Sequence, residues 1–253
     1  MIFWAALGKE LLEQWRSYRL LIAGVVLLFF GLTSPLLTKY LPDIMELAMP
    51  EGAEVAALMP APTAEAAVDQ YVKNISQFGI LLALLLAMGA VAQEKDKGTA
   101  ALVLVKPVPR WVFLGAKFLA LGVTFAASLL VAGGAGYYYT LLLFEAPDLA
   151  GWLALHGLML LVLLVYVAVT LFCSTLTTSQ VVGGGLAFGF LIVLAGVGAI
   201  PGVGAYVPNQ LITWGSGLAR GVPETHWPAL WISLGLVATA LIGAWVIFER
   251  QEL

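Results

Sequence analysis

Charged residues are scarce in this chain, and their scarcity excludes most soluble folds. Asp, Glu, Lys and Arg together make up 11% of the 253 residues, whereas hydrophobic residues make up 61%. The mean hydropathy is +0.97, a balance that soluble domains of this length do not have. The sequence therefore predicts a multi-pass membrane protein.

Two further absences limit the chemistry. Cys173 is the single cysteine, so a disulfide framework is excluded, and no Cys and His pair has zinc-ligand spacing. We assign no metal ligand and no catalytic residue. The chain also lacks a G-x-x-x-x-G-K-[ST] motif, the phosphate-binding loop of many ATPases. If ATP drives this protein, another polypeptide must hydrolyse it.

Six apolar stretches have the length of membrane spans. A helix needs about 20 residues to cross a hydrocarbon core of ~30 Å, and in lipid its backbone polar groups must be satisfied internally. We therefore predict an all-α membrane protein with one transmembrane domain over residues 1–253. The predicted spans are 20–38, 75–93, 113–143, 152–173, 181–200 and 228–248. The extra length of 113–143 is compatible with tilt, with projection into the cytoplasm, or with a break near Gly133–Gly136.

The distribution of Lys and Arg predicts that both termini are cytoplasmic. This orientation places nine of the 12 basic residues in cytoplasmic segments and leaves Lys39, Lys73 and Arg220 outside. Lys117, near the start of the third span, is expected to extend its ammonium group to the lipid headgroups. No other charged residue lies well inside a span, which argues against a proton- or sodium-coupled carrier.

Three segments outside the spans have distinct characters. Residues 1–19 predict an amphipathic elbow helix, with Phe3, Leu7, Leu11 and Trp15 near helical spacing and Lys9, Glu10, Glu13 and Arg16 on other faces. The alternative is that this segment is the cytoplasmic beginning of the first span. Residues 39–74 and 201–227 are predicted external segments, the second with a short helix in the outer interface.

The most compact charged segment, residues 93–111, lies between the second and third spans. Lys95, Lys97, Lys106 and Arg110 favour a cytoplasmic position for it. Thr99 can cap a short helix that Pro107 would end, and that helix would expose apolar side chains. The sequence therefore predicts that the loop over 94–110 is a docking surface for a soluble partner.

Two small motifs admit more than one interpretation. Gly185 and Gly189 form a G-x-x-x-G pair in the fifth span, which indicates close helix packing, either at a subunit interface or within the chain. Ser216 lies in a Trp-Gly-Ser-Gly sequence similar to that of intramembrane serine proteases, and His226 follows ten residues later. A nucleophile and its base need hydrogen-bond contact, which nothing in the sequence indicates here.

Together these segments resemble the permease subunits of type-2 ABC transporters. The resemblance lies in Glu94-Lys95-Asp96-Lys97-Gly98-Thr99, Lys106-Pro107-Val108-Pro109-Arg110 and Gly115-Ala116-Lys117, supported by the elbow segment and the C-terminal Phe248–Leu253. It implies two permease subunits above two cytoplasmic ATPase subunits, which bind ATP and Mg. It also implies that residues 94–106 form a coupling helix in a groove of the ATPase.

The same resemblance assigns roles to individual residues. Glu94, Lys95 and Asp96 would make polar contacts with the ATPase, Gly98 and Thr99 would begin the coupling helix, and Leu102 would fill the groove. Pairing of the first and fifth spans across a homodimer would agree with Gly185 and Gly189.

The sequence thus predicts the permease subunit of an exporter in the plasma (inner) membrane of a prokaryote. The expected partners are the ATPase, a second permease subunit and membrane lipid, without nucleic acid. An ATP-independent channel or carrier is the main alternative, and an intramembrane enzyme using Ser216 is another.

Overall fold

The computed structural model describes residues 2–48, 58, 60–99, 109–222 and 225–251, and these residues form helices without any strand. Six helical segments, counting α4 and α5 as one, are long and apolar enough to cross a membrane, which confirms the predicted fold class. The principal elements are α1 (Ile2–Arg16), α2 (Arg19–Ala48), α4 (Ala64–Ala87), α5 (Ala92–Asp96), α7 (Arg110–Leu143), α8 (Leu149–Leu176), α9 (Gln180–Gly198), the 3-10 turn η1 (Gly204–Tyr206), α10 (Gln210–Ala219) and α11 (Trp227–Glu249).

Short polar side chains begin several of these helices. The Thr63 hydroxyl accepts a hydrogen bond from the backbone N–H of Ala66 at the start of α4. Asp148 caps α8 in the same way at 2.6 Å, and Ser179 caps α9. Each cap satisfies a backbone donor that has no partner in the first helical turn.

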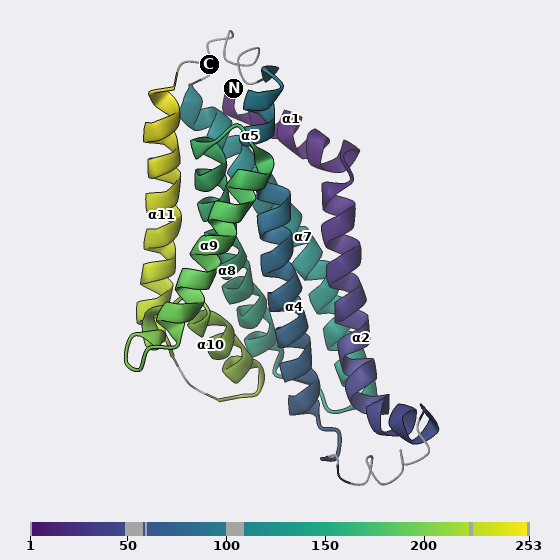
Figure 1. Ribbon diagram of the computed structural model, residues 1–253. Coiled ribbons are helices and arrows are strands. Elements are labelled where there is room, and N and C mark those ends of the chain that lie inside the picture. Colours follow the sequence, from purple (N-terminus) through teal and green to yellow (C-terminus); the bar gives the residue numbers. More distant parts are fainter. Residues whose placement is uncertain (1, 49–57, 59, 100–108, 223–224, 252–253) are drawn as a thin grey trace.

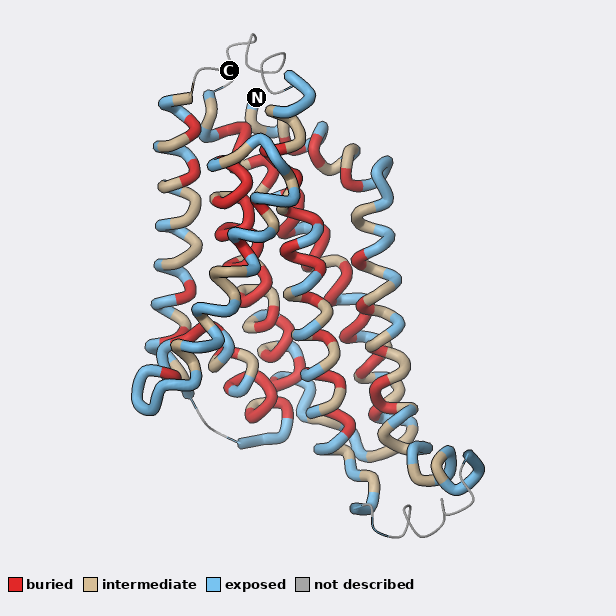
Figure 2. The backbone as a smooth tube through the Cα atoms, in the orientation of Figure 1, coloured by how far each residue is buried: buried red, intermediate tan, exposed pale blue. Residues whose placement is uncertain are grey.

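Helix α8 occupies the middle of the bundle. It packs against α4, α7, α9, α10 and α11, whereas α2 packs mainly on α7 and α4. In the most apolar stretch of α8, 67% of the residues are buried, compared with 11% for α9 and 17% for α11. Figure 2 shows the same contrast, with buried positions concentrated on the inner helices. The outer faces of α9, α11 and α2 are therefore available to lipid or to another subunit.

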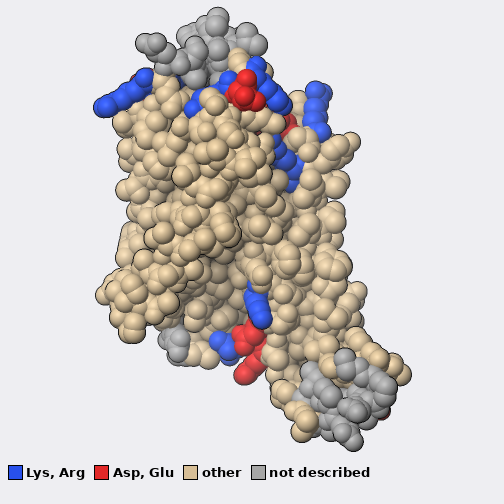
Figure 3. Space-filling model, in the orientation of Figure 1, with Lys and Arg blue, Asp and Glu red and all other residues tan. Residues whose placement is uncertain are grey.

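The two described ends of the chain lie at one end of the bundle. In Figure 1, α1 and the C-terminal turn of α11 lie near α5, at the top of the view. Figure 3 shows charged side chains near both ends of the face in view, with an uncharged region between them. This arrangement suits an apolar bilayer. The cytoplasmic position of the α5 end stays a prediction from the Lys and Arg distribution.

Helix α7 is continuous from residue 110 to 143, so the break considered near Gly133–Gly136 does not occur. The glycines have a different role, which is to admit large side chains. A Cβ atom on Gly133 would lie 2.4 Å from His156 Nε2, and one on Gly136 would lie 2.6 Å from the Tyr71 ring. His156 of α8 is itself buried, with its ring against Gly133 of α7 and its Nε2 atom hydrogen bonded to Tyr71 of α4.

The segment after α9 forms the expected short helix, α10, but its position differs from the prediction. Leu211 and Trp214 are buried, and α10 packs closely against α8. A Cβ atom on Gly151 would lie 2.0 Å from the carbonyl oxygen of Leu218. This contact between backbones requires glycine, and it places one side of α10 inside the protein.

Candidate coupling site

The connection between α4 and α5 is fixed by one buried hydroxyl group. Helix α4 ends at Ala87, and the chain turns before α5 begins. The Oγ atom of Ser174, on α8, donates to the carbonyl of Met88 at 2.8 Å. It accepts from the N–H groups of Val91 at 3.1 Å and Ala92 at 2.9 Å. One side chain thus satisfies three backbone groups at the turn and attaches α5 to α8.

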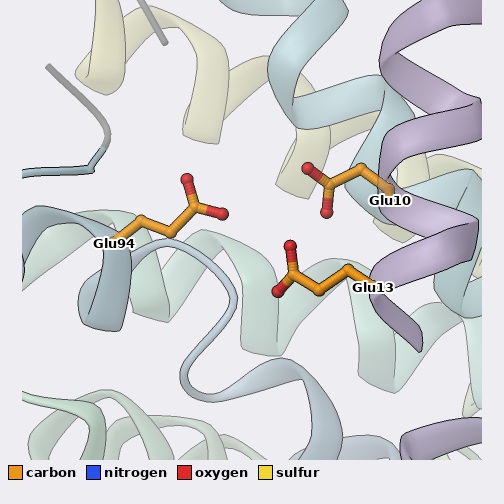
Figure 4. Close-up of side chains that lie close together, drawn as sticks. All are labelled: Glu10, Glu13 and Glu94. Carbon is orange, nitrogen blue, oxygen red and sulfur yellow. The ribbon is translucent and has the colours of Figure 1, made fainter. Parts of the chain in front are cut away.

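Three carboxylates meet where α5 faces α1. Figure 4 shows Glu94 of α5 pointing toward Glu10 and Glu13 of α1. One oxygen from each group lies within 4.8 Å of the others. Like charges this close repel one another, and more strongly where burial lowers the local dielectric. The arrangement therefore requires positive charge between the carboxylates.

Two lysines supply that charge. Lys117 of α7 places its Nζ atom 3.1 Å from Glu10 Oε2 and 2.5 Å from Glu94 Oε1. Lys9 Nζ lies 2.9 Å from Glu10, 3.6 Å from Glu13 and 3.7 Å from Glu94. We call Lys9, Glu10, Glu13, Glu94 and Lys117 the charged cluster. It joins α1, α5 and α7 through ion pairs.

The position of Lys117 contradicts the expectation that its ammonium group reaches the lipid headgroups. The residue is only 3% exposed, and its Nζ also lies 4.8 Å from the centre of the Phe113 ring. Glu10 was likewise expected on a polar face of α1 but is 5% exposed. Each prediction was wrong for the same reason, because the partner acids and base come from distant parts of the sequence.

The electrostatics of the cluster favour ion pairs among its own side chains. Burial alone would lower the pKa of Lys9, but the hydrogen bond to Glu10 and the charges of Glu94 and Glu13 raise it. Lys9 therefore keeps its proton at neutral pH. Three carboxylates at this spacing could also hold a metal ion, but every one of them already contacts an ammonium group.

Both ends of the loop over 94–110 are attached to the C-terminal end of α11. The Lys95 ammonium donates to the carbonyl of Thr175 at 2.8 Å and to the Gln251 side chain at 3.1 Å. The Arg110 guanidinium donates to the carbonyl of Gln251 at 2.9 Å and to that of Phe248. The two ends of the loop are thereby held beside α8 and α11.

The residues predicted to contact an ATPase fall into two groups. The side chains of Glu94 and Lys95 bond within the chain, whereas Asp96, Gly98 and Thr99 are exposed. Gly98 has a φ of +67°, a left-handed conformation that favours glycine just after α5. The Thr99 hydroxyl donates back to the Glu94 carbonyl at 3.2 Å. Leu102, and the helix that Thr99 was expected to cap, lie outside the described residues.

The predicted dimer glycines lie on the outer side of the bundle. Gly185 is exposed, and a Cβ atom added to Gly185 or Gly189 would meet nothing within 4 Å. The buried residues of α9 are Gly183 and Ala187, on another face. The described chain thus leaves the Gly185 and Gly189 face without close helix packing, and its role in a dimer stays a prediction.

Ser216, which suggested an intramembrane enzyme, lies on α10. Its hydroxyl donates to the Thr213 carbonyl at 3.0 Å and lies 3.5 Å from the Arg220 guanidinium. The hydroxyl proton is therefore bonded within α10 itself.

Sequence reasoning missed the charged cluster and Ser174. One signal for the cluster was present, since Glu10 follows Leu7 by three residues and so shares the inner face of α1 with it. An acid on the apolar face of an amphipathic helix indicates a buried partner. Ser174 has no comparable signal, because a lone serine in a span is common.

Comparison with known proteins identifies the family. The family described as ABC-2 family transporter protein matches residues 4–215, which include most of α1, the charged cluster and the loop over 94–110. A protein of Bacillus subtilis (strain 168), the uncharacterized transmembrane protein YxlG, is 32% identical over 183 residues, which make up 70% of this chain and 69% of that protein. The chain therefore belongs to the ABC-2 transporter family, whose members are the membrane-spanning subunits of ABC transporters.

Proposed function

We propose that this chain is the permease subunit of an ATP-driven exporter, and that a separate cytoplasmic ATPase docks on the loop over 94–110. Family membership supports the role of permease and, in general, an ATPase partner. The observation that carries the proposal is the charged cluster, which connects the beginning of this loop to the transmembrane helices.

The cluster explains how movement of the loop would reach the spans. Lys117 bonds to both Glu94 and Glu10, so displacement of α5 acts on α7 and α1 together. Ser174 joins the same segment to α8. ATP binding would draw the two ATPase subunits together, and their closure would favour one of two arrangements of the helices.

The docking surface begins with the exposed Asp96, Gly98 and Thr99 and continues to Leu102, whose side chain would fill a groove of the ATPase. Glu94 and Lys95 would hold this surface in position, because their side chains bond to other parts of the chain. Each of two ATPase subunits would bind ATP and Mg beneath a permease homodimer in the plasma membrane of a prokaryote.

A pair of matched substitutions tests the docking role. The tagged chain is purified from its host membrane, and its companion ATPase is identified by mass spectrometry. Leu102→Asp should abolish ATPase association, because a charge cannot be buried in an apolar groove without a large cost. Leu58→Asp is the control, since Leu58 is 87% exposed and precedes α4 in the sequence. Helix α4 begins at the end of the bundle opposite α5 (Figure 1).

Retained ATPase association in Leu102→Asp would contradict docking on this loop. If the purified chain alone moved substrate across vesicles without nucleotide, the ATP-independent channel or carrier would replace the exporter. Membrane insertion of both variants is checked by extraction and gel filtration, so that misfolding is not mistaken for loss of docking.

The homodimer can be tested separately through Gly185. Because an added Cβ would meet nothing within the chain, Gly185→Leu should leave the subunit folded but separate the two copies. Gly235→Leu, at an equally open and exposed position on α11, is the control. Cross-linking in native membranes measures the dimer. Equal cross-linking in both variants would place the subunit interface elsewhere.

A further inference from the structure

A cavity lies between α7 and α8, in the half of the bundle away from α5. Its volume is about 190 Å³. Leu129, Gly133 and Tyr137 contribute from α7, and Trp152, Leu153 and His156 contribute from α8. Gly134 also lines the cavity, and a Cβ atom added there would meet nothing within 4 Å. The space is therefore open beside Gly134.

The nitrogen atoms at the wall of this cavity are already hydrogen bonded. A carbonyl oxygen can only accept, so His156 Nδ1 donates to the Trp152 carbonyl at 2.7 Å. In the neutral imidazole, Nε2 then accepts from the Tyr71 hydroxyl at 2.6 Å. Trp152 Nε1 donates to the Gly133 carbonyl at 3.1 Å. A ligand in the cavity would thus meet the carbon atoms and ring faces of His156 and Trp152, and neither side chain has a free N–H group.

The cavity opens on the outer surface of the spans. Leu130 and Leu153, which form its rim, are 68% and 59% exposed. In a multi-pass membrane protein these exposed apolar side chains face lipid. The cavity is therefore continuous with the lipid-facing surface, and hydrocarbon can enter it without crossing a polar region.

We propose that this cavity is a binding site for an acyl chain of a membrane phospholipid. A polar headgroup would lose its hydration in this cavity, and the bonded nitrogens of His156 and Trp152 would offer it no donor in return. A run of methylene groups gains dispersion contacts with the tryptophan and leucine side chains. Gly134 makes the room, since a larger residue at this position would occupy the open space beside it.

The test uses phosphatidylcholine with a photoreactive diazirine in its acyl chain. The chain is reconstituted in phosphatidylcholine nanodiscs and illuminated, and labelled peptides are quantified by mass spectrometry. We expect labelling of residues 129–153 to exceed that of the exposed face of α11 several-fold. Gly134→Phe should reduce this excess at least about threefold, because the ring fills the cavity.

Gly157→Phe is the matched control. Gly157 lies on α8 at an exposed position with open space around it, but it does not line the cavity. The excess labelling should persist in this variant. If Gly134→Phe fails to fold, Leu153→Trp serves instead, since the larger ring would cover the rim.

Labelling of residues 129–153 no stronger than that of α11 would overturn the proposal, because the cavity would then be ordinary lipid-exposed surface. Equal labelling in Gly134→Phe and Gly157→Phe would also overturn it.

Discussion

Removing Lys117 should destabilise the protein more than removing any exposed lysine. Lys117→Met keeps the length and apolar stem of the side chain but deletes its charge. Glu10, which is buried, and Glu94, which is half-buried, would then lose the ion pair with the buried one of their two lysines. Breaking a buried ion pair by deleting one partner typically costs about 3–5 kcal/mol.

Because Lys9 stays in the cluster, we expect the cost of Lys117→Met to lie at the lower end of this range of about 3–5 kcal/mol. Lys9 also contacts both acids, at 2.9 and 3.7 Å, and can compensate part of the lost charge. Its side chain is 47% exposed, so the remaining pairs resemble surface ion pairs, each contributing about 0–1 kcal/mol. We therefore expect Lys117→Met to lower the free energy of unfolding by about 3 kcal/mol.

Unfolding in mixed micelles by titration with a denaturing detergent measures this change. Lys97→Met is the control, because Lys97 is exposed on the same side of the protein; its effect should stay within about 0.5 kcal/mol. Lys117→Met combined with Glu94→Gln should cost less than the sum of the single variants, since both members of one pair are then neutral. Equal stability of Lys117→Met and Lys97→Met would refute the buried network.

Three further substitutions test other contacts by the same measurement. Ser174→Ala removes three hydrogen bonds at the α4–α5 turn and should lower the free energy of unfolding by about 2–3 kcal/mol. Ser76→Ala, which loses one exposed hydrogen bond, is the control. Equal losses of stability in the two variants would contradict the role assigned to Ser174. Gly151→Ala should cost at least about 3 kcal/mol, because its Cβ would overlap the Leu218 carbonyl, whereas Gly157→Ala should have no comparable cost. Tyr71→Phe leaves the His156 Nε2 acceptor unpaired and should cost about 1–3 kcal/mol; an unchanged stability would show that this hydrogen bond contributes nothing.

The spans could be predicted from the sequence because each property that defines them is local. Length, apolarity and the absence of charge are readable within one stretch of about 20 residues. The short helix at 210–219 was predictable for the same reason. The local pattern did not show which face of that helix is buried. That face is set by close contacts between α8 and α10, where Gly151 of α8 lies against Leu218 and Gly215 of α10 lies against Leu155. These residues are far apart in the sequence.

The charged cluster was not predictable to the same degree. Its central residue, Lys117, is 107 positions from Glu10 and 23 from Glu94. A lysine near the beginning of a span has two physically reasonable positions, at the lipid headgroups or in a buried ion pair. Which position the lysine adopts depends on whether acids from other helices lie close enough to pair with it. A single sequence does not give the distance between residues of different helices. The family motif, by contrast, identified the loop that the cluster supports.

Helix α7 connects the two polar assemblies of the molecule. Lys117 lies near its beginning, and Gly133, against which His156 packs, lies 16 residues later, or about 24 Å along a helix. Between them α7 is continuous. A continuous α-helix has no hinge at which a displacement could be absorbed, because sharp bends require an interruption of its hydrogen bonds. A shift imposed on Lys117 through α5 would therefore move the wall of the cavity beside Gly134. The continuity of α7, despite four small residues that could have broken it, is thus the feature that would link the cytoplasmic loop to the opposite half of the bundle.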